Sequence, residues 1–226
     1  MADALLLIGR DRYGDPWHDY VATGHRVAQE LAGLGVATQW RSTFPDALDG
    51  IEQPNLIVVL AGRSSGEHGD PTPWTRLHNR LAHFVSAGTA LLALHSAVNA
   101  FGDSEHWPRL IGGRWVEGKS AHPPIGEAVF DIVGSHPIVS GMGPIHAFDE
   151  QYRGLEMALS SEPLLVTRQA SEVHPVAWVA EPTGRGRSVY DGMGHDTRSY
   201  DSSERITLLR REISWLLART FALESR

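Results

Sequence analysis

The sequence contains no cysteine among its 226 residues, which excludes a thiol nucleophile and any metal site built on thiolates. It also lacks a run of about 18 apolar residues, so we expect no membrane-spanning helix. The apolar segment Ala4–Ile8 is too short for the core of a secretory signal and follows no basic leader. We therefore expect a cytoplasmic protein that has no membrane partner.

Basic residues are outnumbered by acidic ones, and the formal net charge is −7. Such a balance argues against a nucleic-acid partner, because a phosphate backbone requires a basic surface. The hydrophobic share of 42% and the charged share of 21% are ordinary for a globular protein. We expect one domain, residues 1–226, whose core is large enough to need neither a disulfide nor a structural metal.

Strand and helix patterns alternate through the first 94 residues. Continuous apolar or β-branched runs predict strands at 4–8, 36–40, 56–60 and 90–94. Apolar residues at helical spacing predict a helix from Tyr20 that ends at Gly35 and another that stops near Gly88. This alternation is typical of an α/β fold whose parallel strands are joined by right-handed crossovers.

The pattern changes over residues 112–181, where shorter strands at 128–133, 164–166 and 176–179 are separated by glycine and proline. We interpret this segment as an antiparallel extension at the edge of the main sheet. Residues 188–190 are expected to return to that sheet. Asp201 and Glu204 are expected to form a capping pair for the last helix. The arginines scattered among acidic residues in the last quarter of the chain are interpreted as a solvated surface.

Three histidines follow predicted strands: His18 after the first, His95 after the fourth and His195 after the strand at 188–190. In a parallel sheet these loops lie on one rim, where ligands of open α/β sheets bind. Each imidazole could be a metal ligand or a general acid and base. Each alone also fits a structural role, in a surface turn or a buried hydrogen bond. Their common position in the topology favours a site.

Known local motifs are few. Ser96 lacks the G-x-S-x-G elbow of a serine nucleophile, so a capping hydroxyl is the better interpretation. There is no H-E-x-x-H, and any metal site would be a dispersed set of histidines and carboxylates, which suits zinc, manganese or nickel. Residues 184–187 form no phosphate loop, because no Lys-Ser/Thr follows them. We expect neither a nucleotide nor a flavin.

Short segments in a fixed order resemble the ThuA-like (trehalose-utilisation) family, a branch of the class I glutamine-amidotransferase-like fold. They are His18-Asp19, Leu94-His95-Ser96-Ala97, Leu110-Ile111-Gly112-Gly113, His122-Pro123-Pro124, His136-Pro137-Ile138, Asp149-Glu150-Gln151-Tyr152, Pro175-Val176-Ala177-Trp178, Gly184-Arg185-Gly186-Arg187 and Gly194-His195-Asp196. The match covers nearly the whole chain. One departure is Ala93, where the family usually has glycine before the Leu-His pair.

The resemblance implies a flavodoxin-like, doubly wound and mostly parallel sheet with helices on both faces. It also implies a role in carbohydrate catabolism. The family has a His-Ser pair where amidotransferases keep the elbow cysteine, so amidotransferase chemistry through a thiol is excluded here. The polar site implied by the resemblance consists of His18, His95, His122, Glu150 and His195.

The sequence is compatible with two functions. The leading hypothesis is an enzyme, such as a metal-assisted hydrolase or isomerase, that acts on a sugar or sugar derivative. His95, His195 and Glu150 would be catalytic, and these three together with His18 and His122 would hold one divalent metal. Candidate substrate contacts are Ser96, Tyr152, Trp107 and Asp196. The alternative is a non-catalytic sugar-binding or assembly module, with a homo-oligomer interface formed by the last helix and the 112–181 extension.

Overall fold

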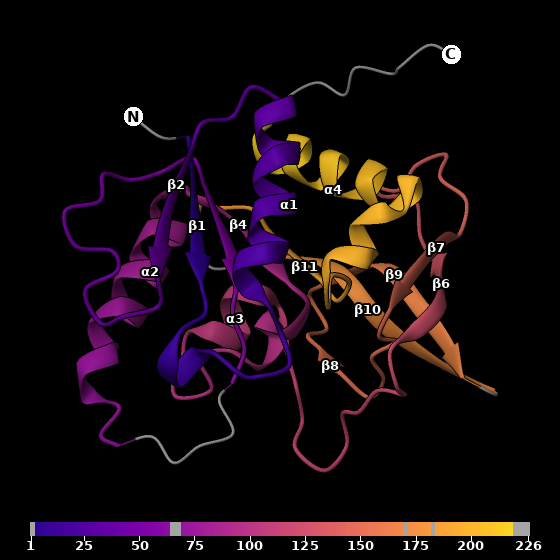
Figure 1. Cartoon of the computed structure of the whole chain (residues 1–226), viewed down its shortest axis with the longest axis horizontal. Coiled ribbons are helices and arrows are strands. Elements are labelled where there is room, and N and C mark those ends of the chain that lie inside the picture. The colour runs from indigo at the N-terminus through magenta and orange to yellow at the C-terminus, as the bar shows by residue number, and fades with distance from the viewer. Residues whose placement is uncertain (1–2, 64–68, 170, 182–183, 219–226) are drawn as a thin grey trace.

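A nine-stranded sheet forms the centre of the molecule (Figure 1). The computed structural model describes residues 3–63, 69–169, 171–181 and 184–218. The strand order is β2-β1-β3-β4-β11-β10-β9-β6-β7, and β5 and β8 form a separate two-stranded sheet. The strands are β1 (Ala4–Ile8), β2 (Thr38–Ser42), β3 (Leu56–Leu60), β4 (Ala90–Leu94), β5 (Gly113–Arg114), β6 (Gly126–Ile132), β7 (Ile145–Asp149), β8 (Glu156–Met157), β9 (Glu162–Gln169), β10 (Glu172–Ala180) and β11 (Ser188–Asp191).

One half of the sheet is parallel. Strands β2, β1, β3, β4 and β11 pair in parallel, in the 2-1-3-4-5 order of flavodoxin-like folds. Every residue of β1, β3 and β4 is buried, because layers of helices cover both faces of the parallel strands. The predicted α/β class and flavodoxin-like core are confirmed. Only β2 is displaced, since it begins at Thr38, two residues later than the apolar run suggests.

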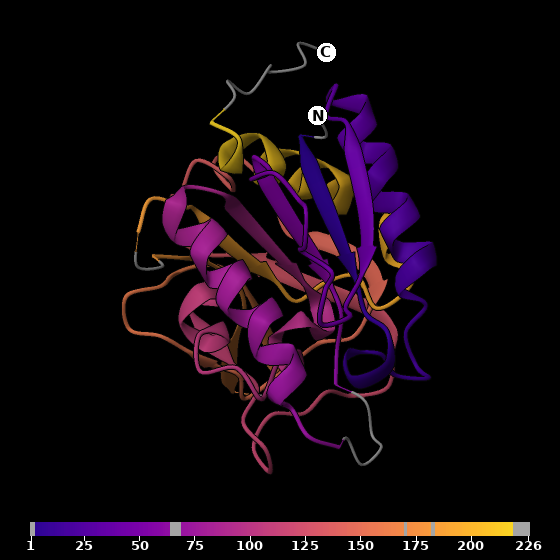
Figure 2. The same ribbon diagram turned by 90° about the vertical axis from the view of Figure 1, so that its left-hand side faces the viewer.

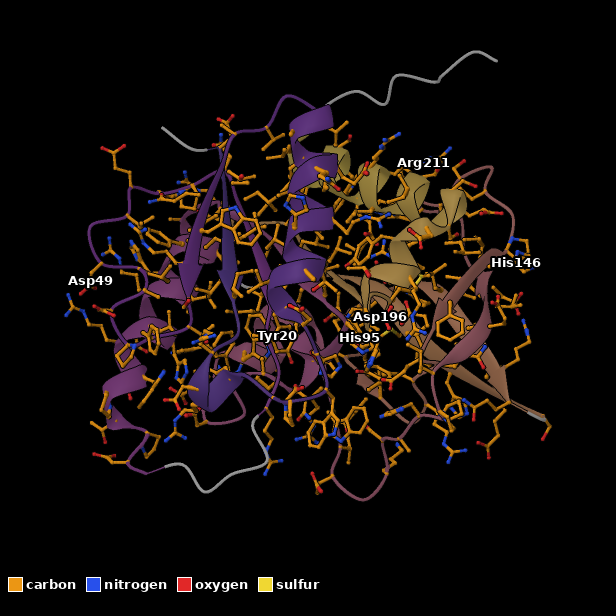
Figure 3. All side chains as sticks on the ribbon, in the orientation of Figure 1. Tyr20, Asp49, His95, His146, Asp196 and Arg211 are labelled. Carbon is orange, nitrogen blue, oxygen red and sulfur yellow. The ribbon has the colours of Figure 1, made fainter. Side chains whose placement is uncertain are left out.

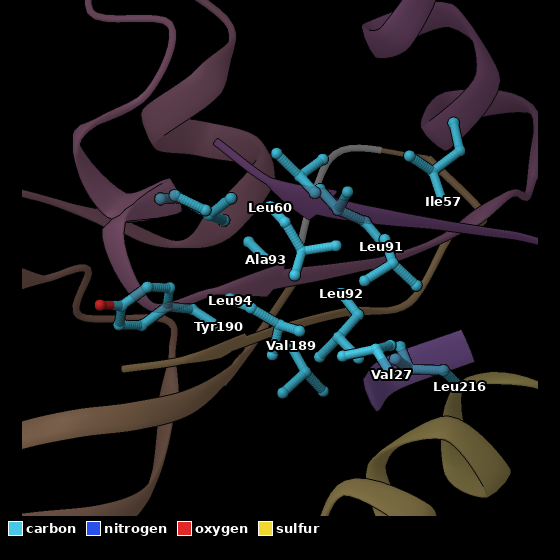
Figure 4. Close-up of a cluster of buried hydrophobic side chains, with 14 of the residues drawn as sticks. Val27, Ile57, Leu60, Leu91, Leu92, Ala93, Leu94, Val189, Tyr190 and Leu216 are labelled. Atoms are coloured by element: carbon cyan, nitrogen blue, oxygen red, sulfur yellow. The ribbon is translucent and has the colours of Figure 1, made fainter. Parts of the chain in front are cut away.

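Helices lie on both faces of this parallel half (Figure 2). Helix α1 (Tyr20–Gly33) packs against α4 (Ser203–Leu216) on one face, and α2 (Thr75–Ala87) packs against α3 (Trp107–Ile111) on the other. Val27 of α1 and Leu216 of α4 meet Leu92 and Val189 of the sheet (Figure 4). The apolar face of each helix is thus buried against the sheet, as the hydrophobic effect favours.

The other half of the sheet is antiparallel, which confirms the extension predicted over residues 112–181. Strand β10 pairs with β11 and β9, β9 pairs with β6, and β6 pairs with β7. Strand β7 was not predicted from the sequence. Although it is at the far edge of the sheet, β7 packs against α4 and the 3₁₀ helix η4 (Thr197–Asp201). The antiparallel half therefore curls back, so that the end of β7 approaches the loop after β11.

The start of α4 differs from its prediction. Asp201 belongs to η4 and pairs with Arg26, and the N-cap is Ser202, whose Oγ accepts from the backbone N–H of Arg205. Arg205 is also fully buried, which corrects the expectation that the late arginines form a solvated surface. Its guanidinium lies 2.9 Å from the Asp191 carboxylate.

Glu212 is the second buried charged residue of α4. Its carboxyl group lies 4.0 Å from the guanidinium of Arg205. Burial, together with the neighbouring Asp191 carboxylate, raises the pKa of Glu212 well above its ordinary value despite the opposing effect of Arg205. Of the two carboxyl groups, that of Asp191 lies closer to the guanidinium of Arg205, and the raised pKa of Glu212 favours the neutral form of its side chain. Within the part of the chain that the structure describes, no helix is both long and apolar enough to cross a bilayer.

Candidate functional site

Three histidines far apart in sequence come together at the carboxyl ends of parallel strands. His18 follows β1, His95 directly follows β4, and His195 follows β11. The ring centroid of His18 lies 5.1 Å from that of His95 and 4.5 Å from that of His195. The ring centroids of His95 and His195 are 5.3 Å apart. Figure 3 shows His95 in the middle of the molecule, between Tyr20 from the N-terminal half and Asp196. The rim topology therefore brings these imidazoles together.

The backbone of His95 has a left-handed conformation, with φ at 48°. Such a conformation is uncommon for a residue with a side chain and is found most often at turns and functional sites. Here it ends β4 abruptly and begins the 3₁₀ helix η3 (His95–Asn99). The sharp turn holds the imidazole at the end of the strand.

Glu150 supplies a carboxylate to the same cluster from the antiparallel half. It follows β7, and its Oε2 atom lies 3.4 Å from Nε2 of His95 and 3.4 Å from Nδ1 of His195. One ligand atom from each of His18, His95, Glu150 and His195 can be chosen so that all lie within 4.8 Å of one another. These four side chains form what we call the His/Glu cluster.

The two imidazoles from β1 and β4 are each held by their Nδ1 atom. Nδ1 of His18 lies 2.7 Å from Oδ1 of Asp15, and Nδ1 of His95 lies 2.8 Å from the carbonyl oxygen of Gly192. Both partners accept, so each Nδ1 carries the proton and the lone pair is on Nε2. Metal-binding histidines are oriented in the same way by a carboxylate or a carbonyl.

The charges of the cluster are coupled. Burial alone would raise the pKa of Glu150, but the contacts with His195 and His95 outweigh burial and hold that pKa well below its ordinary range. Burial would also lower the pKa of His195, yet Glu150 reverses this effect and raises it. For His18, burial prevails over the attraction of Asp15 and lowers the pKa. Glu150 therefore carries a negative charge within the cluster, while burial disfavours the protonated form of His18.

The donor set fits a divalent metal ion. Nε2 of His18 and Nδ1 of His195 are buried and have no hydrogen-bond partner among the described residues. A buried polar atom without a partner is costly, and a bound ion or water is a common explanation. Three imidazoles and a carboxylate form a donor set that suits zinc, manganese or nickel.

His122 lies beside the cluster and was predicted as a ligand. Its Nδ1 atom is 3.2 Å from Oε1 of Glu150 and also bonds the carbonyl oxygen of Pro123. It does not belong to the group of four whose ligand atoms converge within the described residues. With 39% of its side chain exposed, against 8% for Glu150, His122 is on the solvent side of the cluster.

Two predicted substrate contacts are buried around the cluster. Tyr152 packs against the His95 ring, and its hydroxyl lies 2.9 Å from Nε2 of His95. Burial raises the pKa of Tyr152 well above its ordinary value, so the phenol stays protonated and donates this hydrogen bond. Ser96 donates to the carbonyl oxygen of Ala61 and bonds the hydroxyl of Tyr20, which in turn donates to Asp15.

The other two predicted substrate contacts have partners outside the cluster. Trp107 is buried in the core, where its indole N–H donates to the carbonyl oxygen of Ala97, so its ring is not available to stack on a sugar. Asp196 is partly exposed, caps η4 and pairs with Arg198. The structure therefore places Trp107 in the core and outside the His/Glu cluster.

Three residues that support the site were not predicted from the sequence. Asp15 and Tyr20 support His18, and Asp149 bonds the backbone around His195. Asp15 is in a turn-rich loop without periodicity, so no local pattern marks it. Asp149 is next to Glu150 in the sequence, but adjacent side chains of a strand point to opposite faces, so sequence alone indicates only one of these two carboxylates for the site.

Comparisons with known proteins agree with the fold. A ThuA-like protein from Parabacteroides merdae has a TM-score of 0.76 at 17% identity, with 99% of this chain and 92% of that one covered. A glutamine amidotransferase from Thermotoga maritima has a TM-score of 0.60 at 9% identity, with 95% and 97% covered. A β-galactosidase from Rahnella sp. R3 matches over 32% of its own length and 100% of this chain, with a TM-score of 0.64 at 12% identity.

At these identities the structural matches establish the fold alone. No curated protein matches the sequence. A family model described as trehalose utilisation matches residues 17–216, which include every member of the His/Glu cluster. The chain therefore belongs to the ThuA (trehalose utilisation) family.

Proposed function

We propose that this protein is a divalent-metal-dependent enzyme of carbohydrate catabolism that acts on a sugar or sugar derivative. The observation that carries the proposal is the His/Glu cluster, in which four donors from separate loops converge and two imidazoles are already oriented through Nδ1. The trehalose-utilisation family supports a sugar as the substrate class.

The proposed ligands are His18, His95, Glu150 and His195. His18 and His95 would bind through Nε2, because Nδ1 of each is already bonded to Asp15 and to Gly192. When bound, the metal would supply Lewis-acid chemistry, by polarising a substrate oxygen or lowering the pKa of a water molecule. We assign His122 to the substrate side of the site and not to the ligand set.

The neighbouring groups determine which protons are available. Tyr152 keeps its phenolic proton and directs it at Nε2 of His95, so this O–H can donate instead to a substrate oxygen placed there. Glu150 remains ionised because His195 and His95 lower its pKa. The site thus combines a donor, a carboxylate and an exposed imidazole, His122, within reach of one bound sugar.

The experiment compares metal content and turnover in matched variants. The purified protein is stripped with a chelator, reloaded with zinc, manganese or nickel, and incubated with trehalose and a panel of other disaccharides while products are followed by chromatography. We expect one bound metal per chain, and loss of both metal and turnover in His95→Ala and His195→Ala. His146→Ala is the control, because His146 is exposed on β7 away from the cluster (Figure 3).

Two results would contradict the proposal. Wild-type metal content and activity in both variants would show that the cluster is not the site. A wild-type protein that binds no metal, but whose melting temperature rises with a sugar, would favour the non-catalytic binding module.

A further inference from the structure

The carboxylate of Asp149 connects two members of the His/Glu cluster through their backbones. Its Oδ1 atom accepts from the N–H of Glu150 at 2.9 Å and from the N–H of His195 at 3.1 Å. Its Oδ2 atom accepts from the N–H of Gly194 at 2.7 Å and from Oγ of Ser199 at 2.5 Å. Asp149 is 1% exposed, so these hydrogen bonds form where water does not compete.

The sheet itself does not determine the distance between Glu150 and His195. Glu150 follows β7 and His195 follows β11, and strands β10, β9 and β6 separate these two strands in the sheet. The two residues meet only because the antiparallel half curls and β7 packs against η4. Among the described residues, Asp149 is the side chain that bonds the backbone N–H groups of both.

We propose that Asp149 is a positioning residue that holds Glu150 and His195 in the geometry needed to bind one divalent metal ion. This inference rests on the proposed function, because it concerns the same site. Asp149 would not touch the metal, since both of its oxygens are occupied by the hydrogen bonds to the backbone and to Ser199. Residues that support metal ligands in this way commonly change metal affinity about 10- to 100-fold when replaced.

The substitution Asp149→Asn tests this role with little change in volume. An amide has one acceptor oxygen, and its NH₂ group replaces the other. If the NH₂ group is at the Oδ1 position, it faces the N–H groups of Glu150 and His195. If it is at the Oδ2 position, it faces the N–H of Gly194. In either orientation a donor meets a donor, and the backbone around Gly194 and His195 must move.

Two measurements separate positioning from simple loss of stability. Zinc affinity is measured by calorimetry on chelator-treated protein at a temperature where each variant is folded. The contact between the rings of His195 and His18 is measured by NMR cross-relaxation in the absence of metal. Asp131→Asn is the matched control, because Asp131 forms a surface ion pair with Arg168 on the same half of the sheet.

We expect Asp149→Asn to bind zinc about 10- to 100-fold more weakly and to lose the ring contact. Asp131→Asn should retain both properties. If Asp149→Asn does not fold, Ser199→Ala takes its place and should weaken zinc binding in the same direction but by less, because it removes one of the four hydrogen bonds. Wild-type zinc affinity together with an intact ring contact in the variant that folds would overturn the proposal.

Metal binding and the role of Asp149 can be refuted separately. If the wild-type protein binds no divalent metal, the proposed function fails, and the NMR contact alone decides whether Asp149 positions His195. If the wild-type protein binds zinc and Asp149→Asn binds it equally well with the ring contact intact, the function stands and the role of Asp149 is refuted.

Discussion

The carboxylate of Asp15 lies 2.7 Å from Nδ1 of His18, and this contact leaves Nε2 of His18 to face the His/Glu cluster. The same carboxylate also accepts from the backbone N–H groups of Trp17 and His18 and from the hydroxyl of Tyr20. Asp15 is thus fixed from several directions before any ligand binds. Such a carboxylate sets the orientation and the basicity of a metal-binding imidazole.

Replacing Asp15 by asparagine should weaken metal binding while the fold survives. Asp15→Asn keeps an acceptor for the backbone but removes the negative charge beside His18, so we expect zinc affinity to fall about tenfold or more. Calorimetric titration of chelator-treated protein measures the change. Asp201→Asn is the control, since Asp201 is exposed at the end of η4 and pairs with Arg26. Equal affinities for both variants would contradict the role of Asp15.

Gly62 permits the close packing of the network behind His18. A Cβ atom at this position would overlap the hydroxyl of Tyr20 and approach Oδ2 of Asp15 at 2.7 Å. Gly62→Ala should therefore displace these groups, lower stability by about 1–3 kcal/mol and weaken zinc binding. Gly102→Ala provides the comparison, because a Cβ there meets nothing within 4 Å. Thermal unfolding and zinc titration would refute this prediction if the two alanine variants behaved alike.

Because Trp107 is buried in the core, we expect its replacement to change the stability of the protein and not its function. Trp107→Phe removes a buried hydrogen bond to Ala97 and part of an indole ring. We expect unfolding free energy to fall by about 1–3 kcal/mol, with zinc affinity and any turnover unchanged below the melting temperature. A variant of normal stability that had lost affinity for a sugar would instead place Trp107 in the substrate site.

The buried carboxyl group of Glu212 predicts a specific dependence of stability on pH. Its pKa is raised in the folded protein, so its contribution is complete below the ordinary pKa of 4.5 and is lost as pH rises toward the folded-state pKa. Above pH 4.5 the wild type should lose as much as about 1.4 kcal/mol per pH unit relative to Glu212→Gln. Glutamine reproduces the neutral form and does not titrate.

Urea unfolding at pH 5, 6, 7 and 8 measures this difference. The stability of Glu212→Gln relative to the wild type should increase as pH rises from 5 and level off once the pH exceeds the folded-state pKa of Glu212. Glu52→Gln, at an exposed position, should show no such trend. A constant difference between Glu212→Gln and the wild type at every pH would mean that Glu212 is ionised beside Arg205.

The parallel core and the grouping of the histidines were predictable for a physical reason. Buried parallel strands have continuous apolar runs, and their carboxyl ends share one rim, so His18, His95 and His195 could be grouped without a structure. Glu150 could not be placed by this argument, because β7 approaches the rim only through the curl of the antiparallel half. Its place in the predicted site came from the family resemblance.

Other residues were beyond prediction because their environment is created by packing between distant elements. Arg205 and Glu212 belong to a helix whose charged residues resemble a solvated surface, yet both are fully buried beside Asp191. Asp15 and Asp149 act through hydrogen bonds to backbone or side-chain atoms that only the folded chain brings near them. A sequence pattern shows periodicity and turn preference, and neither property identifies such carboxylates.

Anomalous scattering at the zinc absorption edge, from crystals of the chelator-treated protein reloaded with zinc, would locate a bound metal directly. We expect one strong peak within bonding distance of His18, His95, Glu150 and His195. Data that show no peak between these four side chains, or zinc bound only at other surface histidines, would contradict this expectation.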